Sequence, residues 1–231
     1  STSMLAEDLK PNRLEAAKDV AAEFINGRPN DNIGITLFAG ESFTQCPLTV
    51  DHAVLLDMIH NIKCGLIEDG TAVGMGIANA VTRLKDSKAK SKVIILLTDG
   101  TNNKGDISPM TAAEIAKSFG IRVYTIGVGT NGMAPYPYPV GNTVQYVSMP
   151  VEIDEKTLTQ IAGTTDGNYF RATSNSKLKE VYEEIDKLEK TKLNVKEYSK
   201  RDEEYHWFAL AAFLCVLLEV LLRNSILKKI P

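Results

Sequence analysis

A run of five apolar residues, Val93 to Leu97, stands near the middle of the chain and is followed at once by Thr98, Asp99 and Gly100. The run shows no polar alternation, which is typical of a strand buried on both faces of a parallel sheet. Ligands of open α/β sheets bind beyond the carboxyl ends of the strands, so the pattern places Asp99 where binding sites are usually built. The alternative interpretation is that Asp99 only caps the turn that follows.

Helix-like and strand-like segments alternate along the rest of the chain. Apolar residues at helical spacing, bounded by capping or turn residues, predict helices, and short β-branched runs predict strands. The glycines at 74 and 76 indicate close packing of one helix. The proline-rich segment Thr130 to Pro150 predicts an irregular excursion rather than a strand. The expected helices cover 12–26, 51–62, 71–84, 108–120, 154–163 and 174–188, and the expected strands cover 33–39, 43–48, 92–97, 122–129 and 169–172. This order predicts a doubly wound α/β domain over residues 1–190, with a mostly parallel sheet and helices on both faces.

The character of the sequence changes near residue 191. Residues 191–206 are dense in charge and predict a juxtamembrane linker, with Leu193 to Tyr198 as an extended piece. Residues 207–222 are apolar at fifteen of sixteen positions. Extension through Leu227 supplies the ~20 residues that a membrane span needs, so a transmembrane helix is predicted over 207–227. A buried or interfacial helix is the alternative, although such helices usually show a polar face.

The orientation of this span follows from its flanking charges. The tail after the span, 228–231, contains Lys228 and Lys229, Arg223 precedes it, and there is no acidic residue from 223 onward. Short basic segments stay on the cytoplasmic side. We therefore expect a cytoplasmic tail, an inner (cell) membrane location in a bacterium, and a periplasmic α/β domain.

Composition excludes several classes of site. The net charge is -3, and no basic groove or zinc-finger spacing is present, so a nucleic acid partner is not expected. Cys46, Cys64 and Cys215 are isolated, which argues against a zinc site. A disulfide between Cys46 and Cys64 stays open if the domain is in an oxidising compartment, and two free thiols are the more frequent outcome.

Three loops are expected at the carboxyl edge of the sheet, and each offers oxygen ligands. Ser1, Ser3 and Thr71 supply hydroxyl groups, and Asp99 supplies a carboxylate. Loops far apart in sequence converge at one edge of such a sheet. Hard oxygen ligands suit Mg²⁺, Mn²⁺ or Ca²⁺ rather than zinc. The sequence therefore predicts a divalent cation site at this edge, built from these four residues.

These loops resemble the von Willebrand factor A (VWA) domain family over about residues 1–190. Ser1-Thr2-Ser3 resembles the end of its Asp-x-Ser-x-Ser motif, Thr71 its second-loop threonine, and Asp99 its third-loop aspartate. The resemblance implies a metal-ion-dependent adhesion site that binds an acidic side chain of a partner protein. It also implies an Asp two positions before Ser1 and a first, central strand before that Asp. Neither is in this sequence, so the sheet is expected to lack a middle strand. The cation, which a complete family member holds firmly, is expected to lack one anchoring carboxylate here.

Three residues near this edge are candidates for contact with the partner. They are Glu7, Asp69 and Asn102. A solvated first turn is nevertheless the more frequent setting for Glu7 and Asp8, and Asn102 and Asn103 more often shape a loop than bind an ion.

Segments from the beginning to the end of the chain resemble a smaller group within this family. Residues 3–14, the segment FAGESFTQCPLT at 38–49 and the apolar C-terminal run resemble BatA-type membrane proteins of the Bacteroides aerotolerance operon. The resemblance implies other Bat membrane proteins with VWA domains and a MoxR-type ATPase as partners, beside the lipid bilayer. By analogy it implies a role in oxygen tolerance or envelope stress.

Sequence reasoning thus favours a membrane-anchored binding protein over an enzyme. One alternative is a metal-assisted hydrolase in which Asp99 and the ion activate water. That function needs a general base, and only Glu7, Asp8, Glu68 and Asp69 lie near in sequence. The other alternative is a structural membrane protein whose metal site is vestigial.

Overall fold

The computed structural model describes residues 1–140, 143–199, 210, 212–214, 216 and 219–220. The chain divides into two units, Ser1–Glu189 and Lys190–Pro231. The first unit contains the sheet, the helices that cover it and the candidate site, and the following paragraphs concern this unit.

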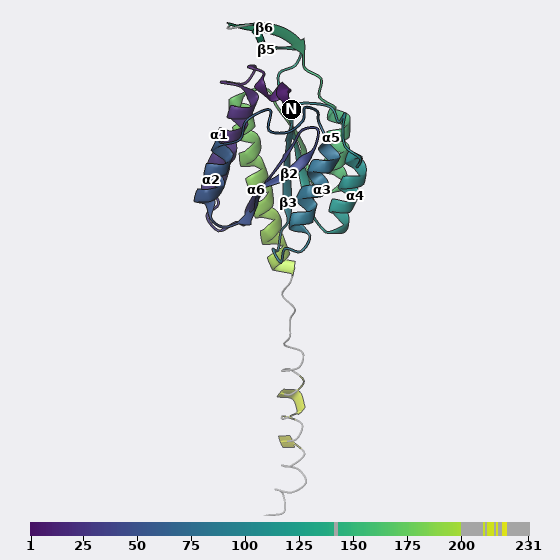
Figure 1. The fold of residues 1–231 in the computed structure, drawn as a ribbon. Helices are drawn as coiled ribbons and strands as arrows, with labels where there is room; N and C mark the ends of the chain where they lie inside the picture. Colours follow the sequence, from purple (N-terminus) through teal and green to yellow (C-terminus); the bar gives the residue numbers. More distant parts are fainter. Residues whose placement is uncertain (141–142, 200–209, 211, 215, 217–218, 221–231) are drawn as a thin grey trace, which may run out of the picture. The chain divides into compact units, whose positions relative to one another are not determined.

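Strands and helices are interspersed along the domain (Figure 1). The elements are η1 (a 3₁₀ turn, Thr2–Leu5), α1 (Arg13–Asn26), β1 (Ile33–Phe38), β2 (Ser42–Thr49), α2 (His52–His60), α3 (Val73–Leu84), β3 (Val93–Thr98), α4 (Pro109–Ser118), β4 (Arg122–Val128), β5 (Met133–Val140), β6 (Thr143–Pro150), α5 (Glu155–Thr164), β7 (Tyr169–Ala172) and α6 (Asn175–Ser199). Side chains cap five α-helices: Asn12, Asp51, Ser108, Asp154 and Ser174 each accept a hydrogen bond from the first turn.

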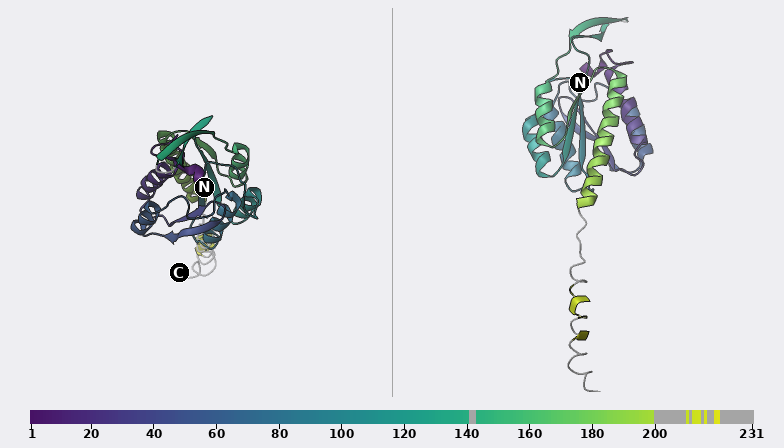
Figure 2. Two further views of the ribbon diagram at one scale, coloured as in Figure 1. Left: turned by 45° about the horizontal axis from the view of Figure 1, so that its top comes forward. Right: turned by 180° about the vertical axis from the view of Figure 1, so that it is seen from behind.

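The central strand β3 is covered by helices on both faces. It pairs in parallel with β4, and β4 pairs in parallel with β7. Ile94 and Leu96 pack with α3, α4 and α5 on one face. Val93, Ile95 and Leu97 pack on the other face, against α1 and α6. Figure 2 shows the helices on either side of these strands. The predicted doubly wound α/β architecture is confirmed.

The sheet consists of separate pieces. β1 pairs only with β2, in antiparallel fashion, and no hydrogen-bonded ladder joins β1 to β3 in the described domain. β1 and β3 therefore each keep one unpaired edge. Helix α3 contacts both pieces. A Cβ at Gly76 would come within 2.9 Å of Phe38, and one at Gly74 within 2.0 Å of the Ile107 carbonyl oxygen, so the predicted close packing of this helix is confirmed.

The prediction of an irregular segment over 130–150 was wrong. β5 and β6 form an antiparallel hairpin that projects from the carboxyl edge of the sheet (Figure 1). Prolines are compatible with this ladder because Pro135, Pro137 and Pro139 alternate along β5. Their missing N–H groups then all fall on one edge of the strand, and that edge faces away from β6.

The extended piece expected over Leu193–Tyr198 was also wrong, because α6 continues as a helix to Ser199. That stretch contains neither proline nor glycine, and Leu193, Lys196 and Glu197 favour helices. Among the described residues, no helix is long and apolar enough to cross a membrane. The span predicted over 207–227 falls largely outside the described residues and stays a prediction.

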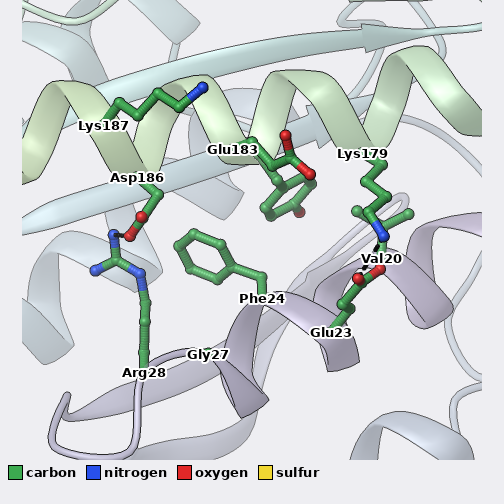
Figure 3. A pocket seen from close by; sticks show the side chains of 10 residues that line it. Val20, Glu23, Phe24, Gly27, Arg28, Lys179, Glu183, Asp186 and Lys187 are labelled. Atoms are coloured by element: carbon green, nitrogen blue, oxygen red, sulfur yellow. Dashed lines mark hydrogen bonds and ion pairs between the residues drawn. The ribbon is translucent and has the colours of Figure 1, made fainter.

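Helix α6 is held at several points between Asn175 and Glu189. Near its start, the Lys10 N–H donates to Asn175 Oδ1 at 3.0 Å. Its middle packs on α1, where the rings of Phe24 and Tyr182 meet edge to face at 5.1 Å. These rings line a shallow groove of about 310 Å³ (Figure 3). Two ion pairs flank the groove, one between Lys179 and Glu23 and the other between Arg28 and Asp186.

The far end of α6 within the domain is fixed by a buried carboxylate. Glu189 is 4% exposed. Tyr124 Oη donates to its Oε1 at 2.6 Å, while Arg122 Nη2 and Ser91 Oγ each donate to its Oε2 at 2.9 Å. These partners lie at the amino ends of β3 and β4, so α6 spans the domain from one edge of the sheet to the other.

Candidate cation and partner site

Asp99 lies immediately beyond the carboxyl end of β3 and is 5% exposed. Each of its carboxylate oxygens has a different partner. Ser3 Oγ donates to Oδ1 at 2.8 Å, and Arg13 Nη1 donates to Oδ2 at 3.0 Å. The carboxylate is therefore held in one orientation, with a hydroxyl group on one side and a guanidinium on the other.

Ser1 and Ser3 belong to the short turn that begins the chain. Ser1 caps η1, and its Oγ lies 2.8 Å from Ser3 Oγ. Since the single hydroxyl proton of Ser3 points to Asp99, Ser1 is the donor to Ser3. The structure thus brings Ser1, Ser3 and Asp99 into one chain of oxygen atoms.

Thr71 joins this edge from the loop before α3. It is 5% exposed. A Cβ at Gly100 would lie 3.5 Å from Thr71 Oγ1, so this hydroxyl stands beside the turn that follows Asp99. The loop is fixed by Asn103, whose Oδ1 accepts from the Thr71 N–H at 2.9 Å. The predicted role of Asn103 in shaping its loop is confirmed.

Sequence reasoning did not identify Arg13 as a site residue. Its side chain is fully buried and forms two bonds to Asp8, from Nε to Oδ1 at 2.8 Å and from Nη2 to Oδ2 at 2.7 Å. With the bond to Asp99, one guanidinium joins two carboxylates. The ring of Tyr136 in β5 lies 5.7 Å from its Cζ, and Tyr136 Oη accepts from Nη1 at 3.3 Å. Arg13 therefore links the site to the hairpin.

The expectation that Asp8 lies in a solvated turn was wrong. Its side chain is 2% exposed, and it also accepts from the Thr130 N–H at 2.8 Å. Burial alone raises the pKa of Asp8, but the hydrogen bonds from Arg13 and Thr130 outweigh it and lower the pKa. Burial likewise disfavours the charged form of Arg13, whereas its bonds to Asp8 and the charge of Asp99 raise its pKa.

One local signal for this cluster is present in the sequence. Asn12 caps α1, so Arg13 occupies the first helical position. A cation there is unfavourable for the helix dipole, which prefers acidic residues at that end. Such a position indicates that an arginine has a partner elsewhere, although it does not tell which one.

The three candidate partner-binding residues already have contacts within the domain. Glu7 Oε1 accepts from Tyr146 Oη at 2.8 Å, and Oε2 lies 3.5 Å from Lys10 Nζ. Asp69 accepts from both the N–H and the hydroxyl of Thr2, at 2.9 and 2.7 Å. Asn102 is exposed, and its Oδ1 accepts a long bond of 3.5 Å from the N–H of Gly74.

The possible general bases near the site are engaged as well. Besides Glu7, Asp8 and Asp69, these include Glu68, which pairs with Lys104. The Thr2 hydroxyl lowers the pKa of Asp69, and Lys104 lowers that of Glu68. A carboxylate whose pKa is lowered is a weaker base near neutral pH.

The donor set fits a divalent cation of the hard class. Among the described residues, no group of three or more His, Cys, Asp or Glu side chains gathers. The candidate site consists instead of three hydroxyl groups and one carboxylate, and the hydrogen bonds among Ser1, Ser3 and Asp99 show that their oxygens converge. Oxygen donors suit Mg²⁺ and Mn²⁺. Arg13 occupies Oδ2 of Asp99 and leaves Oδ1 on the side of the serines.

Cys46 and Cys64 are both free thiols in the structure. Cys64 lies near the site, where its Sγ is 3.5 Å from the carbonyl oxygen of Ser1. The disulfide that the sequence left open is not formed between these two residues.

Comparison with known proteins identifies relatives of this domain. The family model described as von Willebrand factor type A domain matches residues 1–184. The crystal structure of the conserved hypothetical protein BatB from Bacteroides thetaiotaomicron is 35% identical, with a TM-score of 0.71 over 82% of this chain and 95% of that chain. An aerotolerance-related membrane protein from Bacteroides fragilis is 34% identical, with a TM-score of 0.69 over 81% and 94%. The predicted resemblance to VWA domains and Bat-type proteins is confirmed.

A more distant structure shares the fold alone. Proximal thread matrix protein 1 from the mussel byssus, described with a zinc-occupied MIDAS motif, is 24% identical, with a TM-score of 0.60 over 80% of this chain and 43% of that chain. The present chain spans between 56% and 64% of the length of the first curated relatives that it matches.

Proposed function

Because this chain belongs to the von Willebrand factor type A domain family, we propose that its site edge binds a partner protein through a divalent cation. The oxygens of Ser1, Ser3, Thr71 and Asp99 hold the ion. The observation that carries this proposal is the hydrogen-bonded chain from Ser1 through Ser3 to Asp99, which gathers hard oxygen donors from distant parts of the sequence at one edge. When bound, the ion supplies an electrophilic position for an acidic side chain of the partner.

The chain's own residues prepare this edge for binding. Arg13 fixes the plane of the Asp99 carboxylate and offsets part of its negative charge. Asn103 fixes the loop that carries Thr71. Mg²⁺ is the ion that we propose, with Mn²⁺ or Ca²⁺ as substitutes, and the zinc described for the mussel byssus protein supports divalent cation binding by this fold.

The same geometry favours binding over catalysis. A hydrolase needs a base that takes a proton from water. Glu7, Asp8, Glu68 and Asp69 are each hydrogen-bonded or paired within the domain. The contacts of Asp8, Glu68 and Asp69 also lower the pKa of each carboxyl group, which weakens each as a base near neutral pH.

The wider setting of the protein is part of the proposal. Residues 207–227 anchor it in the bacterial inner membrane, with the VWA domain in the periplasm and the tail in the cytoplasm. The apolar run supports this location, as does similarity to a Bacteroides fragilis protein described as a membrane protein. The proposed partners are related Bat proteins and a MoxR-type ATPase. The proposed role of the protein is in aerotolerance or envelope stress.

Calorimetry tests the cation site. Mg²⁺ and Mn²⁺ are titrated into the full chain in detergent micelles and into a version extended upstream by an apolar strand that ends with Asp two positions before Ser1. We expect binding heat in the extended protein, because the added carboxylate completes the site. Asp99→Ala should abolish that heat, whereas Asp106→Ala, at an exposed position in the same loop, should retain it. Absence of binding in the extended protein, or binding that survives Asp99→Ala, would refute the proposal.

A further inference from the structure

The β5–β6 hairpin has an unusual surface. No charged residue occurs between 130 and 151. Several large apolar or aromatic side chains of the hairpin are between 47% and 63% exposed, namely Met133, Tyr138, Val144, Tyr146, Val147 and Met149. Every described residue of β6 is exposed. A solvated, uncharged hairpin of this kind is typical of a surface that another chain covers.

Two hydrogen bonds at the base of the hairpin show which backbone N–H and C=O groups of β5 and β6 point outward. The Glu7 N–H donates to the Pro135 carbonyl oxygen at 3.0 Å, which shows that Pro135 points its backbone groups away from β6. The Val151 N–H donates to Gly132 across the hairpin at 2.8 Å, so residue 151 points inward. Because successive residues of a strand point to opposite edges, residues 150, 148, 146 and 144 point outward.

The two outer edges of the hairpin therefore differ. On β5 the outward positions are Pro135, Pro137 and Pro139, and none of them has an N–H to donate. This edge cannot accept another strand. On β6 the outward positions opposite these prolines are Val144, Tyr146 and Ser148, and each carries both an N–H and a carbonyl.

The outer edge of β6 is open to pairing. Within the part of the chain that the structure describes, β6 pairs with β5 and with no other strand. It lies on the side of β5 away from the helices (Figure 1). The contact between Glu7 and Pro135 agrees with this placement, since it occupies the outer edge of β5.

We propose that β6 pairs edge to edge with β6 of a second copy of this chain. In an antiparallel arrangement with the two-fold axis at Tyr146, Tyr146 faces its own copy, and Val144 faces Ser148 of the second copy. Each such pair exchanges two hydrogen bonds, which gives about six across the interface. An axis at Val147 would place Pro150 opposite Val144 and lose donors, so the register at Tyr146 is favoured.

Two features of the hairpin favour a second copy of this chain as the partner of the β6 edge: its lack of charged residues and its proline-blocked β5 edge. Pairing a strand with itself brings identical side chains together, and no residue from 130 to 151 is charged, so no like charges of the hairpin itself face each other. The Glu7 carboxylate, which accepts from Tyr146 Oη, belongs to a residue bonded at the outer edge of β5. The resulting four-stranded ribbon has a proline-blocked β5 at each outer edge. Association therefore stops at two chains, as in a closed isologous dimer.

The first test uses a proline at the proposed axis. In Tyr146→Pro, the lost N–H points away from β5, so the ladder within the hairpin is kept. Tyr146→Thr is the matched control, because it removes the ring and keeps the N–H. Sedimentation equilibrium of the full chain in density-matched detergent should show a monomer–dimer equilibrium for the native chain and Tyr146→Thr, weakened at least tenfold in Tyr146→Pro. A native chain that stays monomeric, or a dimer that Tyr146→Pro leaves unchanged, overturns the proposal.

Cysteine cross-linking tests the register. Facing residues in such a pair have Cα atoms about 5.5 Å apart, within reach of a disulfide. Tyr146→Cys alone should cross-link under mild oxidation, above the baseline of the native chain with its own three cysteines. Ser148→Cys alone should not, whereas a mixture of Ser148→Cys and Val144→Cys chains should. Equal self-cross-linking at 146 and 148 contradicts the proposed pairing.

Discussion

At the scale of single residues, Arg13 determines the electrostatics of the site. It is fully buried between Asp8 and Asp99, and its guanidinium has the only positive charge among these three side chains. A buried ion group is stable only while every member keeps its partners. The candidate site is therefore sensitive to changes at Arg13, a residue outside the four proposed ligands.

Replacement of Arg13 tests this view. Arg13→Met keeps much of the volume but leaves the carboxylates of Asp8 and Asp99 buried without their partner. We expect a loss of about 3–5 kcal/mol in the free energy of unfolding, the usual result of removing one member of a buried ion pair. Urea denaturation measures it, and Lys10→Met is the control, because the Lys10 side chain is 74% exposed. A loss no greater than that of the control would contradict the role given to Arg13.

The lowered pKa of Asp8 predicts a dependence of stability on pH. A carboxyl group whose pKa is lower in the folded state stabilises the protein above its unfolded pKa of about 4, and this contribution is lost as pH falls through the folded value. The urea midpoint should therefore decrease from pH 5 toward pH 3. In Asp8→Asn the decrease should be smaller, whereas the exposed Asp106→Asn should follow the native profile. Identical slopes for Asp8→Asn and the native chain would disprove the assignment.

The residues of the site differ in how far the sequence could predict them. Asp99 and Thr71 follow from the rule that ligands gather beyond the carboxyl ends of parallel strands, and the structure brings both to one edge. Arg13 and Asp8 could not be placed in that way. Their burial depends on the packing of η1, α1 and the hairpin against one another, which no local pattern encodes.

At the scale of elements, helix α6 is attached to the sheet by more than apolar packing. The stripe that includes Leu178, Val181 and Ile185 is buried against β4 and β7, as the helical spacing predicts. Glu189 adds a buried polar contact at the end of this stripe, where its carboxylate accepts hydrogen bonds from Ser91, Arg122 and Tyr124. Its three donors belong to β3's preceding loop and to β4, so only the folded sheet assembles them.

Tyr124→Phe tests the buried polar contact of Glu189 in α6. The substitution removes the hydroxyl that donates to Glu189 Oε1 and leaves that buried oxygen without this donor. We expect a cost of about 1–3 kcal/mol in the free energy of unfolding. Tyr138→Phe is the control, because Tyr138 is 63% exposed. Hydrogen exchange of amides in α6 should also become faster in Tyr124→Phe, and unchanged exchange would argue against the role of this contact.

The hairpin shows where element prediction from sequence fails. Pro135, Pro137 and Pro139 indicate a segment that cannot form a strand when each is judged alone. Their spacing of two residues is compatible with a ladder, because all three missing donors lie on the outer edge. The proline content of this segment therefore predicts its structure less well than the position of each proline along the strand.

At the scale of the whole molecule, the sheet has an interruption between β1 and β3. Both strands keep an unpaired edge, and α3 contacts both pieces. The half-buried side chains of β1 agree with this arrangement. The resemblance to VWA domains predicted a sheet that lacks a middle strand, and the topology accords with that expectation.

The upstream extension used for calorimetry should also raise stability. An apolar strand between β1 and β3 would bury several side chains at about 1.5–3 kcal/mol each and supply partners for both edges. We expect a higher urea midpoint and slower aggregation by light scattering than for the chain that begins at Ser1. An extension of equal length with its apolar residues changed to serine is the control. If both extensions behave alike, the interruption is not a strand-binding position.

The placement of α6 also has a consequence for mechanical force. Its first residue contacts Lys10 beside the binding edge, and Glu189 is fixed at the opposite edge. A force applied between these two edges of the domain would act along the axis of this helix. The ion pairs and ring contact along α6 would then be loaded together, as in sliding, rather than broken in succession, as in unzipping. If a partner binds at the candidate site as proposed, tension between that site and Glu189 would be carried along α6.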